Sequence, residues 1–411
     1  MPLLTRRRLL AVLGIGGLSA VGARFGLPRL WRVGPARSVE GEARAFVERC
    51  FEGLDPAKIW DGHVHVIGMG TNGSGCDFDP DWQNHLNPWK RFQYELYLGA
   101  AGIPEGPDWD EQYVERLLRL HRLANPEGKL VLLAFDRRYD ESGAPDEART
   151  PFYAPNSWVL EVAARHEELV ACASIHPYRV DALDALDEAF DAGARAVKWL
   201  PSAMGILPSS PRCEPFYERL ARLGLPLITH AGEEQSVEVH GDQDFGNPLH
   251  LRVPLDMGVK VVVAHCASLG ESTDLDQQGT VRTKVPCYDL FVRLFREARY
   301  RENLFADVSA LTFVNRCGRP LRETLMFDEQ EQERLVYASD YPLPALDPLM
   351  STRVLEHHGY LTAEERRLCN LVFDANPLLF DFVVKRTVAV REDGREHRFA
   401  DSVFHTSWLF G

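Results

Sequence analysis

Three absences narrow the classes of protein to which this chain can belong. No apolar run reaches the ~20 residues that a membrane-spanning helix needs. Basic residues are outnumbered, with 46 Lys and Arg against 60 Asp and Glu, so the formal charge of −14 argues against nucleic acid or an acidic membrane surface as the main partner. Low-complexity sequence is also missing: 45% of the residues are hydrophobic and 26% are charged, as in ordinary globular proteins.

Paired cysteine motifs are absent as well. Because no two cysteines are spaced as CxxC, the sequence supports neither a thiolate zinc site nor a thioredoxin-like redox centre. We therefore expect the cysteines to be small buried core residues. The eight lie at positions 50, 76, 172, 213, 266, 287, 317 and 369.

The first 23 residues predict an export signal rather than part of the fold. Arg6, Arg7 and Arg8 precede an uncharged run over 9–23 that ends in small residues. This order is typical of a secretory signal peptide, and the paired arginines resemble a twin-arginine signal. The alternative, an amphipathic N-terminal helix, has no polar face to support it. We therefore expect export, to the periplasm, with the signal either cleaved or kept as an anchor.

From residue 58 onward, short β-branched runs alternate with amphipathic stretches. Eight strands alternating with helices favour a (β/α)8 TIM barrel, although an open doubly wound sheet alternates in the same way. The predicted strands cover residues 58–65, 129–135, 170–175, 194–199, 225–230, 260–265, 304–308 and 335–339. The predicted helices cover residues 111–124, 157–166, 182–191, 214–223, 248–257, 288–298 and 321–333.

Three segments lie outside this repeat. Residues 24–57 form an N-terminal segment ahead of a barrel that spans 58–383. Residues 66–110 are a long aromatic-rich insertion after the first strand, where barrel active sites open, so we interpret them as either a lid or a structural cap. Residues 384–411 form a C-terminal extension, in which one or two strands flank a turn at 392–394.

Chemistry-bearing residues close the predicted strands. Strand residues two apart face the same side, so the two histidines of Asp-Gly-His-Val-His at 61–65 both point into the barrel. Two such histidines alone are a weak sign of a metal site. Later strands each end in another such residue, and in a closed barrel the eighth strand neighbours the first. Polar groups at the ends of apolar strands are costly to bury unpaired, so we predict that at least one divalent ion, zinc being favoured, binds here. The residues are His63, His65, Lys198, His230, His265 and Asp340.

These residues, together with the Ala-Ser-Asp-Tyr-Pro stretch at 338–342, resemble the amidohydrolase superfamily. The stretch is similar to that of the amidohydrolase-related branch that includes aminocarboxymuconate-semialdehyde decarboxylase, where Gly commonly replaces Ala338. In the mononuclear branch the resemblance implies that the metal is held by four residues, while a fifth, His265, orients water or substrate. The four implied ligands are His63, His65, His230 and Asp340.

The binuclear branch implies a different arrangement. There His230 and His265 hold a second metal, and Lys198 bridges both ions as a carbamate. A free ammonium cannot ligate a cation, so two ions are expected only if Lys198 is carboxylated. Otherwise Lys198 binds a substrate anion or packs its stem in the barrel.

Three functions compete at this point. The first is a metal-dependent hydrolase in which metal-activated water cleaves an amide, lactone or ester bond of a small molecule, with Asp340, or else His265, moving the proton. The second is a metal-dependent lyase, a decarboxylase or hydratase, acting on a carboxylated substrate. The third is a non-catalytic exported metal-binding protein. Further predictions assign substrate binding to Arg179, Arg252 and Arg316 and a supporting role beside the metal to Asp307 or Glu233.

Overall fold

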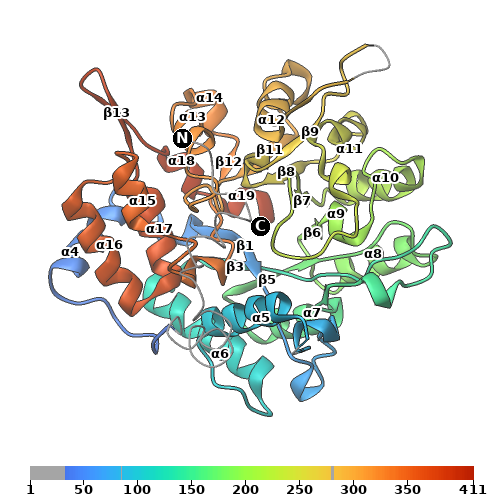
Figure 1. The fold of residues 1–411 in the computed structure, drawn as a ribbon, viewed down its shortest axis with the longest axis horizontal. Coiled ribbons are helices and arrows are strands. Elements are labelled where there is room, and N and C mark those ends of the chain that lie inside the picture. Colours follow the sequence, from blue (N-terminus) through green and yellow to red (C-terminus); the bar gives the residue numbers. More distant parts are fainter. Residues whose placement is uncertain (1–32, 85, 279–281) are drawn as a thin grey trace.

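A barrel of eight parallel strands forms the centre of the computed structural model, which describes residues 33–84, 86–278 and 282–411 (Figure 1). Each strand pairs with the strand that follows it in the barrel repeat. The prediction of a (β/α)8 TIM barrel is therefore confirmed. In order around the sheet the strands are β1 (Trp60–His65), β3 (Lys129–Leu133), β5 (Leu169–Ala173), β6 (Ala196–Trp199), β7 (Leu227–His230), β8 (Val261–Ala264), β11 (Leu304–Asp307) and β12 (Leu335–Val336).

The barrel closes between β1 and the residues that follow β12. Strand β12 is shorter than the predicted range 335–339, because the backbone beyond it turns to meet β1. The N–H of Gly62 donates to the carbonyl of Tyr337 at 3.1 Å, and the N–H of Asp340 donates to the carbonyl of His63 at 2.9 Å. Closure thus places Asp340 directly beside the two histidines of β1.

Helices surround the barrel and return the chain from one strand to the next. The prediction of one helix over 321–333 is wrong in detail, because Asp328 and Glu331 form a capping box that begins a second helix there. The predicted helix at 248–257 begins as a 3₁₀ turn, Pro248–Leu251. The helices between the strands are α6 (Trp109–Ala124), α7 (Asn156–Arg165), α8 (Ala182–Asp191), α9 (Pro201–Met204), α10 (Glu214–Leu223), α11 (Arg252–Asp256), α12 (Cys287–Phe295), α13 (Arg319–Leu325) and α14 (Glu329–Gln332).

The insertion at 66–110 has structure of its own. Its strand β2 (Asp77–Phe78) pairs with β4 (Phe152–Tyr153), and its helix α5 (Pro88–Ala101) leads into α6. A second small hairpin, β9 (Glu271–Thr273) with β10 (Lys284–Pro286), follows β8. Both additions follow the carboxyl ends of barrel strands, and the active sites of this fold lie at that end of the barrel.

The C-terminal part of the chain packs against one side of the barrel and closes its base. Helices α4 (Gly41–Phe51), α16 (Ala363–Ala375) and α17 (Pro377–Thr387) pack together beside α15 (Thr352–His357) (Figure 1). The boundary predicted between 383 and 384 falls inside α17. The strands predicted around 392–394 are present as β13 (Val390–Glu392) and β14 (Arg395–His397), and two unpredicted short helices follow, α18 (Asp401–Phe404) and α19 (Ser407–Phe410).

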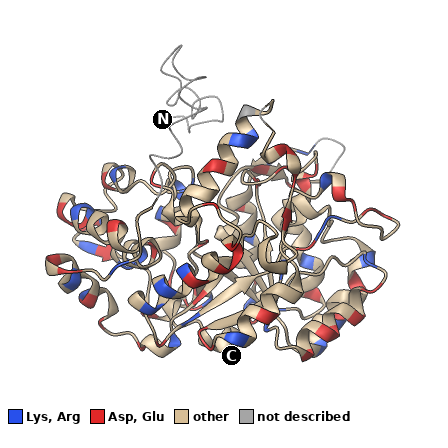
Figure 2. Cartoon of the chain, turned by 90° about the horizontal axis from the view of Figure 1, so that it is seen from below, with Lys and Arg blue, Asp and Glu red and all other residues tan. Residues whose placement is uncertain are grey.

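Side chains of α19 fill the bottom of the barrel. Leu409 and Phe410 belong to the same buried cluster as Phe305 of β11 and pack near Trp60, at the start of β1. A Cβ at Gly62 would lie 3.2 Å from the Phe410 ring, so only glycine fits there without displacing the ring. Figure 2 shows this terminus at the base, with charged residues spread over the outer helices and loops.

Two further predictions concern the whole chain. All eight cysteines are buried and unpaired, as expected of core residues. Among the described helices none is long and apolar enough to cross a membrane. The predicted signal at 1–23 lies outside the described residues.

A fully buried ion pair links α17 to the end of β12. The ammonium of Lys385 donates to Asp381 at 2.5 and 2.6 Å and to the carbonyl of Ala338 at 2.9 Å. Both charged side chains are 0% exposed. Because Ala338 lies two residues before Asp340, the pair tethers the backbone that carries this carboxylate.

We expect Lys385→Met to lower the free energy of unfolding by ~3–5 kcal/mol, because Asp381 would be left buried without a partner. The measurement is urea denaturation followed by circular dichroism. Lys58→Met is the matched control: Lys58 pairs with Asp55 at 3.2 Å in solvent, and its loss should cost only ~0–1 kcal/mol. Equal unfolding midpoints for the two variants would contradict a stabilising role for the buried pair.

Candidate metal centre

Six side chains converge at the carboxyl end of the barrel. Five of them lie in the last three residues of a strand or directly after it, Asp340 follows the end of β12 by four residues, and all six line one pocket. Donor atoms of three of them lie within 4.8 Å of one another. The three are His63, His265 and Asp340; the other three are His65, Lys198 and His230.

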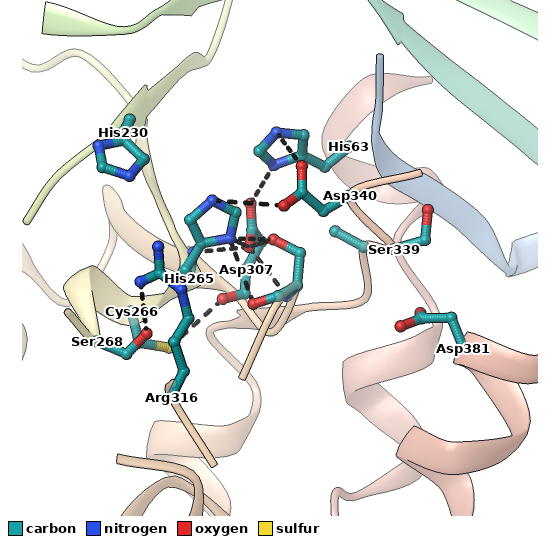
Figure 3. A network of polar contacts seen from close by, with 12 residues as sticks. His63, His230, His265, Cys266, Ser268, Asp307, Arg316, Ser339, Asp340 and Asp381 are labelled. Atoms are coloured by element: carbon teal, nitrogen blue, oxygen red, sulfur yellow. Dashed lines mark hydrogen bonds and ion pairs between the residues drawn. The ribbon is translucent and has the colours of Figure 1, made fainter. Parts of the chain in front are cut away.

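Asp307, the last residue of β11, fixes the orientation of His63. Its Oδ2 lies 2.9 Å from Nδ1 of His63 (Figure 3). A carboxylate only accepts hydrogen bonds, so Nδ1 carries the hydrogen and Nε2 carries the lone pair. The metal-binding nitrogen of His63 is thereby turned into the pocket.

The same carboxylate orients His265 through Ser309. The Ser309 hydroxyl donates to Oδ1 of Asp307, so it can only accept from Nδ1 of His265, which lies 2.6 Å away. Oδ1 also accepts the backbone N–H of His265 at 2.9 Å. The free nitrogen of His265, Nε2, lies 3.9 Å from Oδ2 of Asp340.

Nitrogen and oxygen atoms of three side chains are crowded around Nε2 of His63. Nε2 of His65 and Nζ of Lys198 each lie 3.2 Å from it, and Oδ1 of Asp340 lies 3.5 Å from it. Oδ1 of Asp340 is also 3.0 Å from Nε2 of His65. A cation would balance lone pairs that face one another in this way.

His230 adds an unsatisfied atom to the group. Its Nδ1 is buried and has no hydrogen-bond partner, although buried ring nitrogens are normally paired. A set of imidazole nitrogens with one carboxylate is the donor set that zinc and similar divalent ions prefer. The residues present therefore fit a divalent ion.

Burial sets the protonation of these side chains. It lowers the pKa of His63, His230 and His265 well below the ordinary value, so at neutral pH the rings are in the uncharged form that binds metals. Burial also lowers the pKa of Lys198, although Asp307 and Asp340 oppose the shift.

The carboxyl group of Asp340 behaves differently. Burial by itself would raise its pKa, but its electrostatic interactions with His63 and His65 outweigh that effect and hold the pKa below its usual value. Asp340 is therefore a carboxylate at neutral pH. Its backbone is in the left-handed region, with φ of 65°, and so is that of His265, with φ of 55°. Such strain in non-glycine residues is concentrated at functional sites.

Two contributors were not singled out from the sequence. Glu234 is buried in the pocket wall, with Oε2 3.4 Å from Nε2 of His230, whereas sequence reasoning named its neighbour Glu233. Both follow β7 in a loop, where no periodicity tells which of two adjacent glutamates faces inward. Ser309 was also missed; its only signal is its position two residues after Asp307.

The three arginines predicted to bind substrate are engaged with other groups of the protein. Arg179 pairs with Asp136 at 3.2 Å, and Arg252 pairs with Glu297 at 2.8 Å. Arg316 is buried beside the metal centre. None of the three is among the described residues that line the pocket.

A family model described as Amidohydrolase matches residues 60–368, most of the chain. The chain therefore belongs to the amidohydrolase family, an enzyme family, in agreement with the resemblance in the sequence. No curated protein sequence matches it significantly.

Several solved structures resemble it distantly. An uncharacterised TIM-barrel protein from Bordetella bronchiseptica has 17% identity and a TM-score of 0.47, over 79% of this chain and 99% of that one. A probable 2-pyrone-4,6-dicarboxylic acid hydrolase from Acinetobacter baumannii has 14% identity and a TM-score of 0.41, over 79% and 95%. The 5-carboxyvanillate decarboxylase of Sphingomonas paucimobilis has 11% identity and a TM-score of 0.43, over 86% and 98%.

We expect Asp307→Asn to weaken zinc binding by about 10–100-fold, because the amide has a single accepting oxygen and can no longer accept from both His63 and Ser309, so one of the two imidazoles would lose its orientation. Zinc affinity would be measured by competition with a chromogenic chelator. Asp181→Asn, which changes an exposed partner of Arg179, is the control and should leave the affinity unchanged. An unchanged affinity in Asp307→Asn would show that the carboxylate does not position the imidazoles.

Proposed function

We propose that the protein is a metal-dependent hydrolase that cleaves an ester, lactone or amide bond of a small molecule. The observation that carries this proposal is the carboxylate of Asp340, held between His65 and His265 at the end of the pocket where the donors converge. A divalent ion, which we expect to be zinc, would be held by His63, His65, His230 and Asp340. When bound, such an ion lowers the pKa of water from ~15.7 to ~7 and polarises a carbonyl group.

The residues of the chain supply the proton transfers. The Asp340 carboxylate accepts the proton of the attacking water and later delivers it to the leaving group. Nε2 of His265 faces Oδ2 of Asp340 and orients the water, and His265 is the second candidate for carrying the proton. Burial of Asp340, at 4% exposure, keeps bulk water from competing for that proton.

The number of ions depends on Lys198. Burial favours its uncharged amine, the form that reacts with carbon dioxide to give a carbamate. We propose two ions per chain when Lys198 is carboxylated and one when it is free. Metal analysis of protein purified without chelators, with and without bicarbonate, measures this count.

A lyase is the second candidate. The stretch 338–342 favours it through its resemblance to the decarboxylase branch. A decarboxylase releases carbon dioxide, whereas hydrolysis of an ester or lactone releases acid, so the two reactions have separate readouts.

Asp340→Asn should preserve the fold and reduce turnover by about 10²–10⁴-fold or more, because the amide cannot take up the proton. Turnover would be followed by pH-stat on a panel of lactones, esters and N-acyl amino acids, and by carbon dioxide release on unsaturated dicarboxylates. Metal content is measured alongside, and Asp401→Asn, an exposed change, is the control. Wild-type activity in Asp340→Asn would reject the proposed role.

We also propose that the chain is exported through the twin-arginine pathway. Residues 1–40 fused to a reporter should carry it to the periplasm, and replacing Arg6 and Arg7 by lysine should abolish export. A fusion that stays in the cytoplasm of a host with intact twin-arginine transport would reject the proposal.

A further inference from the structure

The wall of the pocket is built differently from its metal-binding end. Away from the metal-binding residues it is mostly apolar and rich in aromatic rings, which come largely from the insertion at 66–110. The cavity holds about 140 Å³, and an apolar cavity of roughly 150 Å³ accommodates benzene. The rings used below are Phe78, Trp82, Tyr94 and Tyr97 from the insertion and Phe152 from β4.

The polar ends of the two tyrosines are already engaged inside the protein. The hydroxyl of Tyr97 donates to the carbonyl of Ser236 at 2.8 Å. The hydroxyl of Tyr94 accepts from Gln83 at 3.0 Å. These tyrosines therefore contribute apolar ring surface to the wall.

The insertion is held in place over the barrel mouth. In α5 the ammonium of Lys90 lies 2.7 Å from Asp79 and 2.8 Å from Glu238, which follows β7. The bond from Tyr97 to Ser236 makes a second link to the same loop. The aromatic wall is thus largely preformed, as small-molecule sites usually are.

Positive charge is scarce in the wall. Of the described residues that line the pocket, Lys198 is the single lysine or arginine, and its Nζ lies 3.2 Å from Nε2 of His63 in the metal centre. Arg316 is not among the described residues that line the pocket, and its guanidinium donates to Ser268 at 3.1 Å.

The carboxyl groups that line the pocket are engaged at its metal-binding end, where Asp340 faces His65 and Glu234 faces His230. Glu234 and Asp340 are both lining residues. A substrate carboxylate placed against the aromatic wall would lose its hydration and find no guanidinium among the described lining residues to receive it. An uncharged ring meets none of these costs and buries apolar surface against the insertion.

Building on the proposed hydrolase function, we propose that the substrate is an uncharged ester, lactone or amide without a carboxylate. Its compact aromatic or aliphatic group, about the size of one benzene ring, packs against the aromatic wall, and Trp82 is a main determinant of this specificity. The reaction adds one water across the acyl bond and gives an acid together with an alcohol or amine.

The test compares a neutral and a charged probe of equal size. Acetophenone, which cannot be hydrolysed, and benzoate are titrated calorimetrically into the zinc-loaded protein. We expect acetophenone to bind more tightly than benzoate, and Trp82→Ala to weaken acetophenone binding about tenfold. Trp408→Ala, which removes a Trp that is 51% exposed, is the matched control and should bind as the wild type does.

A second variant keeps the test decisive if Trp82→Ala does not fold. Phe78 is only partly buried, so Phe78→Arg is tolerable and places a cation in the wall. It should shift the preference toward benzoate. Tighter binding of benzoate by the wild type, or an unchanged preference in Phe78→Arg, would overturn the inference.

Turnover separates this inference from the proposed function. Hydrolysis of phenyl acetate should exceed that of 4-acetoxybenzoate. The reverse order would overturn the uncharged substrate and leave the hydrolase standing. Selective binding of acetophenone without hydrolysis of any ester, lactone or amide would overturn the hydrolase and leave the preference of the wall standing.

Discussion

Closure of the barrel between β1 and the end of β12 is the constraint on which the site depends. It joins residues about 275 positions apart, since Oδ1 of Asp340 meets Nε2 of His65 at 3.0 Å. The backbone bond from Asp340 to His63 and the buried Lys385–Asp381 pair hold the same segment from its two sides. Without this closure the histidines of β1 would have no carboxylate opposite them.

Asp307 organises the donors once the barrel is closed. One of its oxygens accepts a hydrogen bond from Nδ1 of His63. The other accepts from the hydroxyl of Ser309, which in turn accepts from Nδ1 of His265. A single buried carboxylate thus sets the tautomers of two rings on different strands, and both free nitrogens face the pocket. The opposite wall is apolar, so the cavity combines a polar floor for chemistry with a surface that selects by shape and lack of charge.

The strand pattern was readable from the sequence because a fully buried parallel strand must be a short β-branched run. The same logic located His230 and His265, each of which ends such a run. It did not distinguish Glu234 from Glu233, and it did not show that Arg179 and Arg252 already have carboxylate partners. The sequence did not predict that the helix at 321–333 is divided into two. The capping box that begins the second helix lies within a stretch of continuous helical periodicity, which by itself predicts a single helix.

The sequence by itself determined which residue types end the strands, and with them the barrel and the family to which the chain belongs, because hydrophobic periodicity and strand-end positions are local properties. Only the tertiary structure decided which of the insertion's aromatic rings line the pocket, how Asp307 reaches two imidazoles, and that Phe410 fills the base beneath Gly62. Those contacts join segments far apart in the chain, and their geometry depends on the closed barrel, which no local pattern encodes.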